Sequence, residues 1–264
     1  MFKSSIFVPF VTLGDPTKEQ SAKLIKSLID NGAGALELGF AFSDPIADGP
    51  VIQRANNRAL KSGITTKKAF EILEDAREYS SIPISLMLSF NIMFSYGTEK
   101  FYKKCSETGI DAVLVPDVPL EESKELVELA KKYAVHHISL ITPTTTDERM
   151  RAISKISSGY AYLVSLLGTT GTREKLAQEL PEMISRAKKN MPMPVYVGFG
   201  VSKPGHVQNV LGLGADGAIS GSAVCKIIEK NLENFGEMEK EIGKFCREMS
   251  GRADKQNLKK HERG

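Results

Sequence analysis

Short hydrophobic runs alternate with longer amphipathic stretches along most of this chain. There are eight such runs, and most are apolar at nearly every position, which is typical of parallel strands buried on both faces. The runs cover residues 7–13, 35–40, 84–88, 112–117, 137–142, 161–165, 195–200 and 217–220. Apolar residues recur with the helical period in residues 17–31, 66–79, 98–108, 121–133, 146–155, 174–189, 204–213 and 234–249.

Eight strand–helix units in strict alternation, with no linker between them, predict one closed parallel barrel, the (β/α)8 or TIM barrel. An open doubly wound sheet is the alternative, although it rarely holds so many regular units. The length of 264 residues suits a barrel, which typically takes roughly 250. We assign residues 1–251 to this single domain and expect residues 252–264, which are Lys/Arg-rich, to form a basic, disordered tail. Pro181 should break or kink the sixth helix.

Charge and cysteine content exclude several classes of function. The formal net charge of +3 is too small to indicate a nucleic-acid partner. Neither the 3 cysteines nor the 4 histidines show metal-ligand spacing, so we expect no metal site and no disulfide framework. No apolar run approaches the ~20 residues of a membrane span. We therefore expect a protein of the reducing cytoplasm, without a membrane or nucleic-acid partner.

A carboxylate lies within the second predicted strand. In barrels of this type the reactive groups project from the C-terminal ends of the strands. Strand alternation places Leu36 and Leu38 on one face and Glu37 on the other, so Glu37 faces the lumen if the leucines face the helices. Burial would raise its pKa toward the range that suits proton transfer near neutral pH. A structural Glu held in a hydrogen-bond network explains the pattern equally well.

The loop after this strand, residues 40–50, is long for a βα connection and supplies Asp44 and Asp48. Asp48 follows Glu37 by eleven residues, and the two carboxylates could converge on one pocket. Each Asp precedes or lies near a Pro or Gly, so an ordinary turn role is the alternative, above all for Asp44. At the end of the fourth strand, Asp117 is interpreted as bracing a loop rather than lining the pocket rim.

Glycines follow three consecutive predicted strands. They lie in the segments 168–171, 198–200 and 221–222, and the last of these opens a short helix. Glycine lets backbone N–H groups approach an anion, and the phosphate site of many barrels lies after strands seven and eight. The pattern therefore favours a phosphate site, with tight turns that bind nothing as the alternative.

Long, ordered segments of the chain resemble the alpha subunit of tryptophan synthase, from about residue 7 to about residue 226. The matching segments are FVPFVTLGDP, ALELGFAFSDPIADGPVIQ, GIDAVLVPDVPLEE, the VGFG of the seventh strand and ADGAISGSA. The resemblance implies retro-aldol cleavage of indole-3-glycerol phosphate to indole and glyceraldehyde 3-phosphate, a lyase reaction of tryptophan biosynthesis. It places the catalytic pair on Glu37, as acid and base, and on Asp48, as acceptor of the indole N–H.

The resemblance also implies binding residues, a partner and the place of the cofactor. The phosphate would rest on Gly171, Gly200, Gly221 and Ser222, the indole pocket would be lined by Phe10, Tyr162 and Phe199, and Thr170 would contact Asp48 on closure. The family forms an αββα complex, in which indole passes through a tunnel to the beta subunit. Pyridoxal phosphate belongs to that beta subunit, so this chain needs no cofactor. Asp44 and Asn91 match regions that face the partner.

The chain departs from the family pattern in its loops. Phe40 and Ala41 replace a smaller residue and a proline, Ser89 stands where a Tyr is frequent, and the loop after the sixth strand lacks an Arg. An active alpha subunit is the first hypothesis, because both carboxylates and the phosphate glycines are present. A catalytically impaired subunit that binds and activates the beta subunit is the second. A different phosphate-binding barrel enzyme, such as an isomerase of histidine or tryptophan synthesis, is the third.

Overall fold

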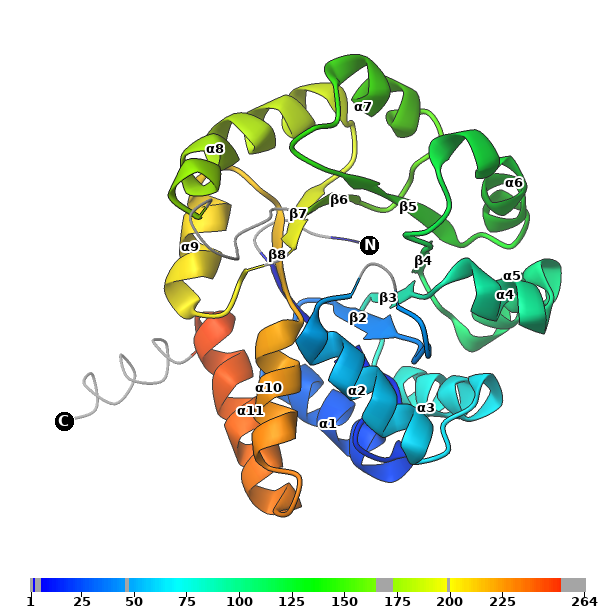
Figure 1. Cartoon of the computed structure of the whole chain (residues 1–264), viewed down its shortest axis with the longest axis vertical. Helices are drawn as coiled ribbons and strands as arrows, with labels where there is room; N and C mark the ends of the chain where they lie inside the picture. The colour runs from blue at the N-terminus through cyan, green and yellow to red at the C-terminus, as the bar shows by residue number, and fades with distance from the viewer. Residues whose placement is uncertain (1, 3–5, 46–47, 165–172, 199, 253–264) are drawn as a thin grey trace.

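Eight parallel strands close into one barrel in the computed structural model, which describes residues 2, 6–45, 48–164, 173–198 and 200–252 (Figure 1). The strands pair in sequence order, and β8 closes the barrel against β1. Their bounds are β1 Ile6–Thr12, β2 Leu36–Gly39, β3 Ile84–Met87, β4 Ala112–Leu114, β5 His136–Ile141, β6 Ala161–Val164, β7 Val195–Gly198 and β8 Gly217–Ser220. The predicted (β/α)8 barrel is confirmed, and each predicted strand is present.

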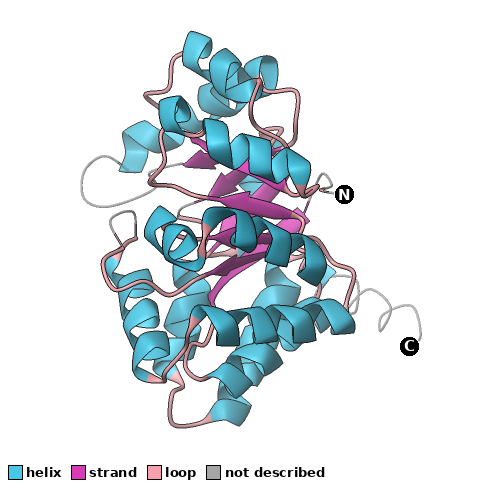
Figure 2. Cartoon of the chain, turned by 90° about the vertical axis from the view of Figure 1, so that its right-hand side faces the viewer, coloured by secondary structure: helices cyan, strands magenta, loops and turns pink. Residues whose placement is uncertain are grey.

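Helices surround the barrel on the outside, as Figure 2 shows from the side. Eight of them match the predicted helical segments: α1 Lys18–Asp30, α3 Thr66–Tyr79, α5 Thr98–Thr108, α6 Lys124–Lys132, α7 Asp147–Ser154, α8 Arg173–Asn190, α9 Pro204–Gly212 and α11 Phe235–Met249. The short helix predicted after the eighth strand is α10, Ser222–Lys230. A 3-10 turn, η1 Leu120–Glu122, precedes α6. Helix α8 continues through Pro181, so the expected break is absent.

Two helices were not predicted from the sequence, α2 (Pro50–Lys61) and α4 (Phe90–Tyr96). The buried face of α2 consists of Ile52, Ala55, Asn56 and Ala59, so its apolar stripe combines one large residue with two alanines. Its start carries the usual signal, with Pro50 in the first turn after Gly49. Helix α4 is only 7 residues long, too short to show a helical period.

The core is divided by the barrel wall. Leu36 and Leu38 belong to the large cluster between strands and helices, whereas the lumen holds a separate cluster that includes Leu114, Ile138 and Tyr162. Alternation along β2 therefore points Glu37 inward, as predicted.

Near the N-terminal ends of the strands the barrel is filled by aromatic rings. Tyr160 stacks on Tyr196 with ring centroids 4.4 Å apart, and Phe2 meets Tyr160 edge-on at 5.0 Å. Aromatic pairs at these separations contribute about 0.5–1.5 kcal/mol beyond the area they bury. The lumen is therefore a packed core at the N-terminal ends of the strands. A substrate would have to bind at the C-terminal ends.

Helix α11 ends at Met249, and the predicted tail of residues 252–264 lies, apart from its first residue, outside the described residues. Within the described part of the chain, none of the helices combines the length and the apolar character that crossing a bilayer requires.

Candidate active site

Glu37 is the most deeply buried carboxyl group at the centre of the barrel. The residue is 1% exposed, and the Tyr160 hydroxyl donates a hydrogen bond of 3.2 Å to its Oε1. The Tyr160 oxygen also lies 3.0 Å from Ser85 Oγ, which donates to the carbonyl of Leu36. Among the described residues, the hydrogen-bond partners on this side of Glu37 are therefore neutral hydroxyl groups.

The pKa of Glu37 is raised from 4.5 to about 8. Burial is the largest cause, because the charged form loses its hydration, and the nearby negative charge of Asp48 adds to the rise. The hydrogen bond from Tyr160 opposes the rise but does not cancel it. Near neutral pH the group is therefore mostly protonated and able to give up its proton, which is the property that general acid–base catalysis requires.

Asp48 lies on the other side of the site, just before α2. Asn56 Nδ2 donates to Asp48 Oδ2 at 3.0 Å, and Gln53 Nε2 donates to the Asp48 carbonyl at 2.8 Å. Burial raises the pKa of Asp48, while the hydrogen bond from Asn56 lowers it. The charge of Asp48 also contributes to raising the pKa of Glu37 and of Tyr162, so the structure brings the two predicted carboxylates to one site.

Two of the predicted pocket aromatics lie beside these carboxylates. Phe10 pairs with Glu37 across β1 and β2, is 3% exposed, and lies so close to Gly39 that a Cβ there would be 2.5 Å from its ring. Tyr162, on β6, is 5% exposed and stands equally close to the backbone of Gly198. Glycine at both strand ends therefore lets an aromatic ring lie flat against the backbone. Phe199, the third predicted aromatic, lies outside the described residues.

Gly200, Gly221 and Ser222, three of the predicted phosphate residues, lie at the C-terminal ends of β7 and β8. Gly200 adopts φ +78°, a left-handed conformation that favours glycine, and its carbonyl oxygen lies 3.0 Å from His206 Nδ1. Gly221 precedes α10, which has no side-chain cap, so backbone N–H groups of its first turn remain available to an anion. Gly171 and Thr170 fall outside the described residues.

Asp44 and Asn91, the residues predicted to face a partner, are both exposed. Asp44 accepts a hydrogen bond from its neighbour Ser43 at 2.8 Å. Asn91 lies in the first turn of α4, three residues from Phe94, which is 67% exposed. Among the described residues only Tyr79 and Leu232 are also large, hydrophobic and exposed, at 46% and 38%. Phe94 is the most exposed of these three side chains.

Two of the departures from the family pattern leave the carboxylates untouched. Phe40 is 6% exposed and packs edge-on against Phe70 and Phe101, both at 5.7 Å, in the core outside the barrel. Ser89 joins Asp117, whose carboxylate accepts hydrogen bonds from Ser89 Oγ at 2.5 Å and from the Phe90 backbone N–H at 2.9 Å. The predicted bracing role of Asp117 is therefore confirmed, at the start of α4.

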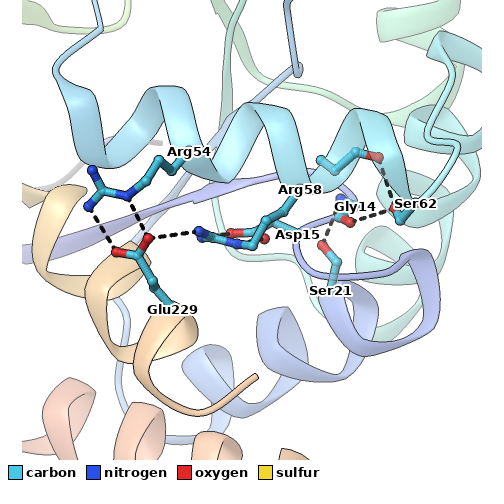
Figure 3. A network of polar contacts seen from close by, with 8 residues as sticks. Gly14, Asp15, Ser21, Arg54, Arg58, Ser62 and Glu229 are labelled. Carbon is cyan, nitrogen blue, oxygen red and sulfur yellow. Dashed lines mark hydrogen bonds and ion pairs between the residues drawn. The ribbon is translucent and has the colours of Figure 1, made fainter. Parts of the chain in front are cut away.

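A polar network beside the site ties α2 to its neighbours (Figure 3). Asp15, which follows β1 and has a fully buried side chain, is bound by both ends of the Arg58 guanidinium at 2.8 and 2.9 Å. Arg58 also reaches Glu229 on α10 at 3.3 Å, and Glu229 pairs with Arg54 one helical turn earlier. This network fixes α2 against the turn that precedes α1 and against α10, the helix that follows Gly221.

Sequence reasoning missed two residues that donate hydrogen bonds to the carboxylates, Tyr160 and Asn56, and also Ser85, which contacts the Tyr160 hydroxyl. Tyr160 could have been found, because it precedes Tyr162 by two residues and so shares its face of the strand. Asn56 was missed together with α2. Among the described residues no group of three or more His, Cys, Asp or Glu side chains is arranged to hold a metal ion.

Comparison with known proteins identifies the family. The family model described as tryptophan synthase alpha chain matches residues 2–254. The tryptophan synthase alpha chain of Photobacterium profundum is 47% identical over 244 residues, which cover 92% of this chain and 91% of the relative. That of Methanothermobacter thermautotrophicus is 46% identical over 226 residues, covering 86% and 84%.

Solved structures agree with the sequence relatives. A structure of the tryptophan synthase a2b2 complex from Pyrococcus furiosus matches with a TM-score of 0.88 and 40% identity, covering 95% of this chain and 100% of the matched chain. The A-subunit of the same organism matches with a TM-score of 0.87, 40% identity and the same coverage. From its sequence and from its barrel, this chain belongs to the tryptophan synthase alpha chain family.

Proposed function

We propose that this chain cleaves indole-3-glycerol phosphate to indole and glyceraldehyde 3-phosphate by a retro-aldol reaction. The observation that carries the proposal is the pair of carboxyl groups at the barrel mouth. Glu37 is buried with its pKa raised to about 8, and Asp48 acts on it through its charge. A buried acid with a raised pKa beside a second carboxylate is a frequent arrangement in acid–base catalysis.

Glu37 gives one proton to the substrate and takes up a different proton from it. In the first step its acid form donates a proton to C3 of the indole ring, which gives the protonated indolenine with its positive charge on nitrogen. In the second step its carboxylate removes the proton of the glycerol hydroxyl next to the ring. The bond between C3 and that carbon then breaks, its electron pair restores the indole, and the carbon becomes the aldehyde. Glu37 ends protonated, so atoms and charges balance without a co-reactant.

Asp48 stabilises the charge that develops on the ring. Protonation at C3 leaves positive charge on the indole nitrogen, and a carboxylate that accepts the indole N–H is stabilising mainly at that stage. The same negative charge disfavours ionisation of Glu37, so Glu37 stays protonated until it gives its proton to the substrate.

The remaining predicted residues bind the two ends of the substrate. Phe10, Tyr162 and Phe199 line the indole end, and Gly171, Gly200, Gly221 and Ser222 hold the phosphate with backbone N–H groups. Support for this comes from the uncapped start of α10. Thr170 contacts Asp48 when the site closes. The placement of Phe40 in the outer core and of Ser89 at the start of α4 supports an active subunit over an impaired one.

The chain works with a tryptophan synthase beta subunit in an αββα heterotetramer and in the cytoplasm. Pyridoxal phosphate belongs to the beta subunit, which uses the indole to make L-tryptophan. The surface of α4 with Asn91 and Phe94, together with the loop at Asp44, forms the contact with that partner. Phe94→Ser should weaken beta binding at least about tenfold, as expected for an exposed aromatic anchor. Leu232→Ser, which also replaces an exposed apolar side chain but lies elsewhere, should leave binding unchanged. If both substitutions weakened binding equally, the surface around Phe94 would not be part of the interface.

The deciding experiment is release of glyceraldehyde 3-phosphate from indole-3-glycerol phosphate, with and without the cognate beta subunit. Release that the beta subunit accelerates is the expected result. If no aldehyde forms while the beta reaction still speeds up, the chain is a binding subunit and the cleavage reaction is wrong.

A further inference from the structure

Asn56 lies behind the Asp48 carboxylate, on the inner face of α2. The residue is 3% exposed, and its amide donates to one carboxylate oxygen, Asp48 Oδ2, at 3.0 Å. An amide donor differs from a Lys or Arg in one respect that matters here. It satisfies the oxygen without adding a charge that would neutralise Asp48.

We propose that Asn56 is a positioning residue for the cleavage reaction: it fixes the Asp48 carboxylate through one oxygen and leaves the other free to accept the indole N–H. The inference rests on the proposed function, in which Asp48 meets developing positive charge. A carboxylate free to rotate would have to be ordered during the reaction, whereas a carboxylate already held in place acts without that cost.

The titratable groups around Asp48 give its carboxylate no positive charge, so the hydrogen bond from the Asn56 amide is needed to stabilise the charged form. Glu37 on β2, Tyr162 on β6 and Cys225 on α10 all have pKa values raised by the Asp48 charge, and in all three burial is the larger cause. All three are therefore mostly neutral at pH 7, and none of them supplies a positive charge to Asp48. Burial raises the pKa of Asp48 as well, and the hydrogen bond from Asn56 is what opposes it. Without the amide, Asp48 would take up a proton at a higher pH and lose its ability to accept.

The position of Asn56 is fixed by its own helix. On the same buried face, Ala55 and Ile52 pack with Phe10 and Cys225. Two residues further on, Arg58 is held between Asp15 and Glu229 (Figure 3). These contacts hold α2 in place, and with it the Asn56 amide beside Asp48.

The test compares Asn56→Leu with Asn57→Leu. Leucine has nearly the shape of asparagine and suits a helix, but it donates no hydrogen bond. Asn57 is exposed on the same helix and serves as the matched control. We expect N56L to lower kcat for aldehyde release about tenfold or more at pH 7, and to move the acidic limb of the kcat/KM profile to higher pH. N57L should stay within about twofold, and binding of glycerol 3-phosphate by calorimetry should be the same in both. A uniform loss of packing would lower activity at all pH values without moving the limb.

A second measurement does not depend on turnover. The carboxyl carbon of Asp48, labelled with carbon-13 and assigned by its loss in Asp48→Asn, reports the pKa of that group directly by NMR. We expect this pKa to be higher in N56L than in N57L. Equal pKa values and equal pH profiles would overturn the proposal. If N56L does not fold, the pair Asn56→Ala and Asn57→Ala decides by the same two readouts. If the wild-type chain releases no aldehyde, the proposed function fails while the titration still tests Asn56.

Discussion

Glu37 and Asp48 are the same chemical group in two different settings. Glu37 stands on a strand, inside the barrel wall, with a phenol as partner and little contact with water. Asp48 stands in a loop at the start of a helix, half-buried, with an amide as partner. Burial raises both pKa values, that of Glu37 to about 8, and the Asn56 amide opposes the rise at Asp48. The difference teaches that position in the fold, rather than residue type, assigns the roles of proton donor and charge stabiliser.

The largest effect should come from removing the strand carboxylate. Glu37→Gln keeps the shape of the side chain but cannot carry the proton, so cleavage should fall at least about a thousandfold, within the range of general acid–base catalysis. The measurement is aldehyde release, with circular dichroism as the control for the fold. Unchanged turnover would sink the acid–base assignment.

The same substitution should stabilise the protein. Between pH 4.5 and about 8 the unfolded chain ionises Glu37 while the folded protein keeps it protonated, so wild-type stability is lost as pH rises through this window. Glutamine does not titrate, and the gain at pH 7 should be about 3 kcal/mol by this linkage. Urea unfolding at pH 4.5 and pH 7 measures it. An equal difference at both pH values would mean that Glu37 is not the titrating group.

Changing the loop carboxylate should cost less. Asp48→Asn keeps the shape but loses the charge, and cleavage should fall about a hundredfold, as for loss of one preorganised electrostatic partner. Because the Asp48 charge no longer raises the pKa of Glu37, the basic limb of the pH profile should move down. A basic limb that stays in place would show that the two groups do not interact.

The smallest effect concerns the partner of Glu37. Tyr160→Phe removes one hydrogen bond that lowers the pKa of Glu37, so the basic limb should move up slightly and turnover should change by only a few-fold. Ser85 loses a partner in the same variant, so a modest loss of stability should accompany the shift. A change as large as that of Glu37→Gln would make Tyr160 itself a participant in the chemistry.

The strand half of the site could be predicted from the sequence, and the helix half only in part. Period-2 alternation in β2 placed Glu37 correctly, because a strand fixes side-chain direction locally. Asn56 and Arg58 were not predicted, because α2 was not recognised as a helix although its apolar residues lie on one face. The contact of Arg58 with Asp15 and Glu229 joins segments 43 and 171 residues apart, which no local pattern reveals. Thr170, Gly171 and Phe199 stay predictions.

The stacked rings of Tyr160 and Tyr196, with Phe2 against them, also determine how hydrogen is passed from one turnover to the next. Because these rings fill the barrel at the N-terminal ends of the strands, the proton of Glu37 must exchange with solvent through the C-terminal end. The substrate itself occupies that end during the reaction. The hydrogen taken from the hydroxyl of one substrate molecule can therefore remain on the enzyme until the next molecule binds.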